Sequence, residues 1–94
     1  MAIGSKYRNI ATATTTTVKS GRGRLTAIVC NTAVLSGVIT IYDNTAASGA
    51  VIATITEPAT LLQNHYDIDY KGLEFGIGLT IVTSASHNLT VIYE

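Results

Sequence analysis

The chain has 94 residues, of which 47% are hydrophobic, with six basic side chains, six acidic side chains and one cysteine. This length fits a single domain over residues 1–94, and high apolar content with zero net charge excludes an intrinsically disordered chain. One cysteine excludes an intramolecular disulfide framework. Zero net charge argues against a dedicated nucleic-acid binder, whose affinity comes largely from neutralising phosphates.

A two-residue alternation of apolar and polar side chains recurs along the chain, and this is the period of β-strands. Strands are expected at 7–10, 13–18, 25–30, 38–43, 51–55, 66–70, 78–83 and 88–93. Turn-forming clusters separate them, including Lys71-Gly72, and threonine, which favours strands, is the commonest residue with fifteen copies. We therefore expect an all-β fold: a compact antiparallel β-sandwich, jelly-roll-like or immunoglobulin-like, with seven or eight short strands.

Two segments allow more than one interpretation. The N-terminal segment 1–17, which ends in the threonine-rich stretch 12–17, is expected to be an N-terminal arm or an edge strand. Pro58 can open a single helical turn reaching Gln63, or this stretch is a loop that crosses between the sheets. The uncharged runs 25–42 and 75–93 are long enough for membrane helices, but their threonine, asparagine and glycine content indicates strand pairs, so we expect no membrane contact.

Charge is distributed unevenly along the chain. Five cations and no acid precede residue 25, whereas five acids and one cation follow residue 48. This asymmetry suggests a basic segment that meets an acidic surface on a neighbouring subunit or another protein. The alternative is that the topology brings both ends together within one subunit. A small β-domain without crosslinks also has open sheet edges to cover, so we expect a homo-oligomer.

Residues that usually carry catalysis are few. His65 and His87 are the only side chains that normally titrate near neutral pH, and neither lies in a recognisable nucleophile motif. Cys30 lies in an apolar strand and is expected to be a buried, inert thiol. We therefore expect no enzyme, no catalytic residue, no cofactor and no metal. A small hydrolase would need one of the two histidines beside a nucleophile or a metal.

One predicted strand segregates its polar and apolar side chains. Alternation puts an acidic set on one side and an aromatic set on the other, namely His65, Asp67 and Asp69 opposite Tyr66, Ile68 and Tyr70. The acidic set is a candidate ligand face, with donors suited to a divalent cation. The alternative is a solvated polar face opposite a core-facing one. The basic segment 19–24 can contact phosphate but fits a hairpin connection better, because no strand-to-helix context surrounds it.

Longer stretches carry a resemblance: residues 18–25, 28–32, 37–49, 52–55, 78–83 and 89–93. The most distinctive piece is Ile39-Thr40-Ile41-Tyr42-Asp43-Asn44-Thr45 followed by Gly49, a strand and a polar loop. Together these stretches resemble a family of small virion proteins of tailed bacteriophages, over about residues 18–93.

The resemblance implies a compact β-sandwich without enzymatic activity that acts as a capsid decoration or head-fibre protein. It implies a homotrimer in the virion that binds the major capsid protein or another virion protein, after synthesis in the cytoplasm of the bacterial host. We expect the N-terminal basic segment, Lys6 and Arg8 with Lys19, to contact the capsid or neighbouring subunits. The alternative is a carbohydrate-binding or host-attachment module that uses Tyr66, Tyr70 and the adjacent acids.

Overall fold

The computed structural model describes residues 6–60 and 65–94. In this part of the chain there are eight strands and no helix, which confirms the all-β prediction. The strands are β1 (Lys6–Ile10), β2 (Thr15–Ser20), β3 (Gly23–Thr32), β4 (Val38–Asp43), β5 (Ala50–Thr56), β6 (Tyr66–Phe75), β7 (Gly78–Thr83) and β8 (Asn88–Tyr93). Pro58 and the two residues after it are not helical. The rest of the predicted helical turn, 61–63, and the N-terminal residues 1–5 lie outside the described residues.

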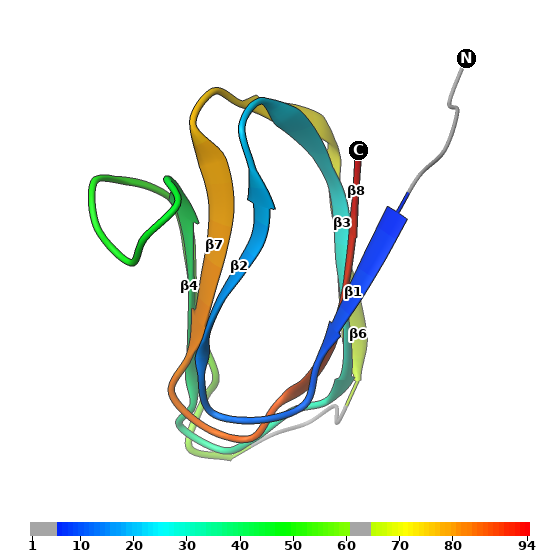
Figure 1. Ribbon diagram of the computed structural model, residues 1–94. Coiled ribbons are helices and arrows are strands. Elements are labelled where there is room, and N and C mark those ends of the chain that lie inside the picture. The colour runs from blue at the N-terminus through cyan, green and yellow to red at the C-terminus, as the bar shows by residue number, and fades with distance from the viewer. Residues whose placement is uncertain (1–5, 61–64) are drawn as a thin grey trace.

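The strands form two antiparallel sheets that face each other (Figure 1). The first sheet has the order β1-β8-β3-β6 and the second has the order β2-β7-β4-β5. The pairs β1–β8, β2–β7, β3–β6 and β4–β5 show that the chain is one long hairpin wrapped over itself. This is the jelly-roll arrangement of eight strands. Of the two sandwich types expected from the sequence, the structure is therefore the jelly roll.

Branched aliphatic side chains fill the space between the two sheets. The fully buried ones include Leu25, Ile28, Leu89 and Val91 from the first sheet and Ile39, Ile41, Leu79 and Ile81 from the second. Phe75, the single phenylalanine, closes this core at the end of β6 and is 1% exposed. These side chains alternate with outward ones except at the bulges, so the period seen in the sequence corresponds to the inner and outer faces of each sheet.

Strand β6 differs from the sequence prediction, because it continues past Lys71 and Gly72 to Phe75. Both residues have positive φ values, 57° and 72°, and the pairing of β3 with β6 shifts register at this point. The Lys71 backbone N–H also donates a hydrogen bond of 2.8 Å to the Asp69 carboxylate. The expected turn is thus a β-bulge, which uses the same residue types as a turn but bends the strand without ending it.

The β4–β5 loop stands out from the second sheet, as the green segment in Figure 1 shows. One carboxylate fixes its start: Asp43 accepts hydrogen bonds from the backbone N–H groups of Gly76, Ile77 and Gly78, at 2.9 to 3.3 Å. Asn44 then closes the loop by donating to the Ser48 carbonyl at 2.8 Å. Asp43 and Asn44 belong to the stretch that carries the family resemblance. Asp43 therefore connects the β4–β5 loop to the β6–β7 turn.

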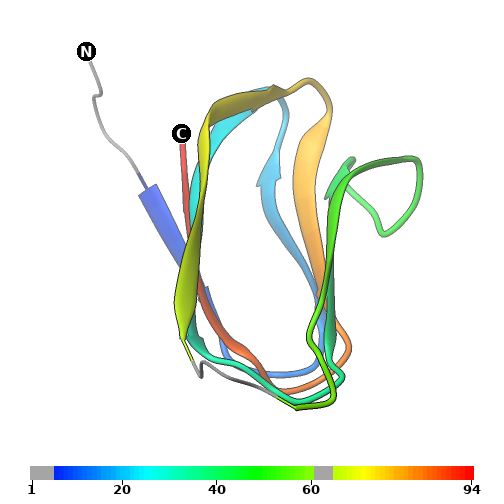
Figure 2. The same ribbon diagram turned by 180° about the vertical axis from the view of Figure 1, so that it is seen from behind.

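The edge strands define two sides of the sandwich. Strands β1 and β2 are the edges on one side, and β6 and β5 are the edges on the other. Figure 1 looks toward the side with β1 and β2, and Figure 2 toward the side with β5 and β6. The threonine-rich segment leads into β2, an edge strand of the second sheet. We call the side between β1 and β2 the open side; it carries Lys6, Arg8 and Lys19.

Candidate interaction surface

Lys6 and Arg8 lie on the core-facing side of β1. In the β1–β8 register Arg8 is opposite Val91, which is fully buried, and Lys6 is opposite Tyr93, which packs against the core. Directly paired residues in an antiparallel sheet point to the same face. Both cations are nevertheless exposed, because β1 is the last strand of its sheet. Their charges therefore lie at the rim of the core, on the side where neither sheet continues with a further strand.

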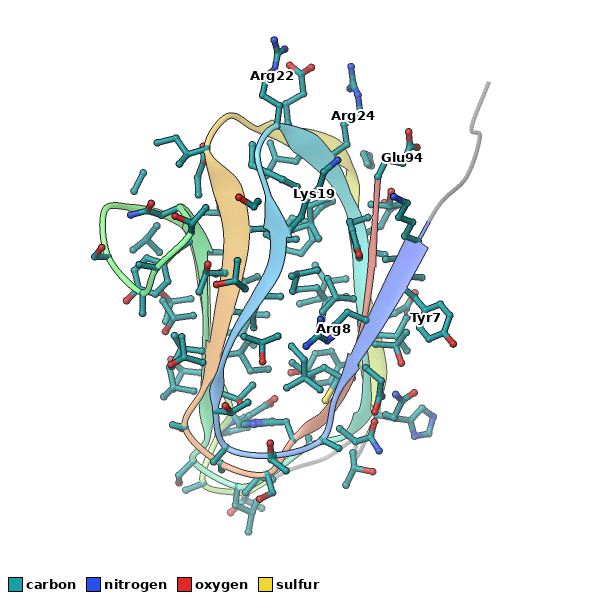
Figure 3. The ribbon with its side chains drawn as sticks, viewed as in Figure 1. Tyr7, Arg8, Lys19, Arg22, Arg24 and Glu94 are labelled. Carbon is teal, nitrogen blue, oxygen red and sulfur yellow. The ribbon has the colours of Figure 1, made fainter. Side chains whose placement is uncertain are left out.

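Lys19 reaches the same rim from β2. The pairing of β2 with β7 shifts register between Thr17 and Lys19, so that Lys19 is opposite the buried Leu79 and the bulged Val18 is also buried. Simple alternation would place only one of these two neighbours on the core-facing side. Figure 3 shows Arg8 and Lys19 in the space between β1 and β2, whereas Tyr7 points away from it.

Ion pairing separates these cations from the two arginines near the end of the sandwich. Arg24 lies 3.1 Å and Arg22 lies 4.0 Å from Glu74, and all three side chains are more than half exposed. Among residues 6–60 and 65–94, Lys6, Arg8 and Lys19 have no ion pair. Pairing within one subunit, one of the two interpretations of the charge asymmetry, therefore accounts for Arg22 and Arg24 only. Of the five cations before residue 25, the predicted contact residues Lys6, Arg8 and Lys19 are those without an ion pair in the described part of the chain; Lys71 of β6 has none there either.

Charged side chains at an edge have a structural effect as well as a recognition effect. Core-facing cations on edge strands discourage pairing with an arbitrary strand of another chain, because that strand would bury an unpaired charge. The same cations create a positive potential that favours an acidic partner and selects against a basic one. The cations of the open side therefore disfavour pairing with an arbitrary strand of another chain and favour binding of a partner that supplies carboxylates.

The candidate ligand face lies at the other edge of the first sheet. His65, Asp67 and Asp69 are exposed, and the alternating Tyr66, Ile68 and Tyr70 are half-buried toward the core, as the sequence pattern indicated. Asp69 accepts the backbone hydrogen bond that stabilises the β6 bulge. In the described part of the chain, no three His, Cys, Asp or Glu side chains are grouped closely enough to hold a metal ion.

A hollow of about 330 Å³ lies beside this face. Its lining residues are Val29, Cys30, Asn31, His65, Tyr66 and Asp67. The structure thus brings His65 and Asp67 together at one hollow, but Asp69 does not line it. Asn31 is engaged, because its amide donates to Asn88 and Thr90 at 3.2 and 3.1 Å. The hollow contains a few polar groups without a converging set of donors or acceptors.

A buried polar cluster lies where three loops meet, and sequence reasoning did not find it. Glu57, 5% exposed, follows β5, and its carboxylate accepts a hydrogen bond from the Tyr66 hydroxyl. The Nε2 atom of His87, which is fully buried in the β7–β8 loop, lies 3.7 Å from the same carboxylate. Gly37 of the β3–β4 loop packs on this histidine so closely that a Cβ atom would overlap the imidazole ring.

The surroundings of this cluster control the chemistry of Tyr66 and Cys30. Burial, together with the hydrogen bond to Glu57, raises the pKa of the Tyr66 phenol. Burial also raises the pKa of the Cys30 thiol, which is fully inaccessible. A thiol with a raised pKa is a poor nucleophile. His87 and Cys30 are both fully buried, and the contacts of the cluster hold the three loops against one another. No sequence signal pointed to it, because Glu57 and His87 lie 30 positions apart in two loops.

Comparisons with known proteins found no matching family model, no matching curated protein and no matching solved structure. Within the described residues, no helix is long and apolar enough to cross a membrane.

Proposed function

We propose that this chain is a structural subunit of a bacteriophage virion, a capsid decoration or head-fibre protein that assembles with copies of itself on the particle. It acts by binding and has no catalytic role. The open side, with its cations Lys6, Arg8 and Lys19, is the association surface. The major capsid protein or another virion protein is the further partner.

The observation that carries the proposal is the combination of a jelly roll with uncompensated cations on its open side. Eight-stranded jelly rolls are frequent in viral capsid proteins, although a fold alone does not define a function. The open side adds a specific feature, because Arg8 and Lys19 come from different sheets and lie along the same rim of the sandwich. Cations placed in this way are costly to cover with an apolar surface and favour an acidic protein surface.

The alternative, a carbohydrate-binding or host-attachment module, needs aromatic rings exposed for stacking on a sugar. Tyr66 and Tyr70 instead pack against the core, and the Tyr66 hydroxyl donates its hydrogen bond to the buried Glu57. The residues on which that alternative rested therefore give it no support. Glycan-array binding by a folded variant in which leucine replaces Tyr66 and Tyr70 would identify a sugar site elsewhere on the molecule, because leucine has no ring to stack on a sugar.

Co-sedimentation with phage particles tests the proposed function. Particles are prepared from the phage that encodes the chain, once with its gene intact and once with the gene deleted. The purified chain is expected to pellet with the deletion particles up to a fixed number of copies, and much less with intact particles, whose sites are filled. A folded chain that stays in the supernatant with both preparations contradicts the proposal.

A further inference from the structure

Two charged pairs with the same spacing lie on opposite edges of the first sheet. Lys6 and Arg8 are two residues apart on β1, and Asp67 and Asp69 are two residues apart on β6. Residues at this separation in a strand are about 7 Å apart and lie on one face. The cations of one copy therefore match the carboxylates of another copy in sign and in spacing.

Neither pair is neutralised within its own subunit. All four side chains are exposed, and none of them forms an ion pair within residues 6–60 and 65–94. The single hydrogen bond of these four side chains to a described group is the one that Asp69 accepts from the Lys71 backbone N–H. Asp67 accepts no hydrogen bond from any described group. These charges are hence free to interact with a partner.

Symmetry restricts how two copies can use these edges. If the open side of one copy meets the open side of another, Arg8 approaches a second Arg8, and a contact between two β6 faces brings carboxylates together. Like charges facing each other oppose such contacts. A contact between different edges joins opposite charges, and contacts of this kind close into rings or extend into filaments.

We infer that copies of this chain associate head to tail, with the open side of one subunit on the β6 face of the next. Arg8 then lies near Asp67 of the neighbour. The inference rests on the proposed function and names the partner of the open side as a second copy of this chain.

Charge exchange between the two edges tests this assignment. The variants are Arg8→Glu, Asp67→Lys and the double variant with both substitutions, which restores zero net charge; Arg22→Glu, at the end of the sandwich, is the matched control. Within the described residues the side chains of Arg8 and Asp67 form no hydrogen bond and no ion pair, so these substitutions remove no polar side-chain contact. The assembly is measured by sedimentation velocity, and circular dichroism checks that each variant is folded.

Each single variant is expected to weaken association at least tenfold, which corresponds to about 1.4 kcal/mol, and the double variant is expected to recover most of the loss. The Arg22→Glu control is expected to associate like the natural chain. A natural chain that stays monomeric at about 100 µM overturns the inference, because weak assemblies have micromolar dissociation constants. So does a control as disruptive as Arg8→Glu, or a double variant no better than the singles. Capsid binding by a chain that is monomeric would sustain the proposed function while removing this inference.

Discussion

At the scale of single residues, Glu57 organises the buried polar contacts between the loops. Its carboxylate accepts the hydrogen bond of the Tyr66 hydroxyl and faces the ring of His87. The Nε2 atom of that ring has no hydrogen-bond partner in the described structure. The carboxylate thus satisfies the Tyr66 hydroxyl and faces a second buried polar group without bonding to it.

Replacement of Glu57 by alanine is expected to lower the free energy of unfolding by about 1–3 kcal/mol, because it leaves the Tyr66 hydroxyl without its acceptor. Glu57→Gln is the control, because its amide oxygen can still accept from Tyr66, and its loss should be clearly smaller. Urea unfolding at neutral pH measures both values. Equal losses for the two variants would show that the hydrogen bond is unimportant.

At the scale of elements, the β4–β5 loop depends on the carboxylate of Asp43. The backbone N–H groups of Ile77, Gly76 and Gly78 hold the pKa of this carboxyl below its usual value. A depressed pKa means that the charged form stabilises the folded chain. This stabilisation is complete above the unfolded pKa of about 3.9 and is lost as the pH falls through the lower folded value.

Asp43→Asn is expected to cost about 1 kcal/mol at pH 7, near the lower end for a charge-assisted hydrogen bond because the group is accessible to water. The difference from the natural chain should begin to shrink below about pH 4, where Asp43 becomes protonated in the unfolded chain, and should vanish below the lower pKa of the folded chain. Urea unfolding of both chains at several pH values provides the measurement. A difference that does not change with pH would mean that the charge of Asp43 is not what holds the loop.

The sequence predicted the strands well where alternation was strict. The predicted limits of β4, β7 and β8 agree with the structure, because inward and outward side chains alternate there without interruption. The β6 bulge was mistaken for a turn, since Lys71-Gly72 suits both and only the pairing with β3 distinguishes them. Alternation also correctly separated Asp67 and Asp69 from the tyrosines of β6.

The candidate site was only partly accessible from the sequence. The basic character of the N-terminal segment was evident, but the position of Lys19 beside β1 follows from the jelly-roll topology and from the bulge at Val18. Pairing of Glu74 with both arginines joins residues about 50 positions apart, and no local pattern indicates it. Glu57 and His87 meet because three loops converge at one end of the sandwich.

At the scale of the whole molecule, charge and shape support the same account. The domain is small, with extents of 37 × 29 × 18 Å, and both of its sheets end in open edges. A domain of this size buries a limited fraction of its surface on folding, so further burial against a partner adds stability. The fold places Lys6, Arg8 and Lys19 on the open side, and Asp67 and Asp69 on the outer face of the opposite edge strand β6. Assembly through these edges would cover both the open strands and the uncompensated charges.

The molar mass in solution as a function of salt tests this account most directly. Light scattering on the natural chain should give a multiple of the 9.9 kDa subunit mass at about 0.1 M salt, where the Debye length is about 10 Å. The mass should fall toward that of one subunit at about 1 M salt, where screening shortens this length to about 3 Å. A mass of one subunit under both conditions, or a larger mass that salt does not change, would contradict assembly through complementary charged edges.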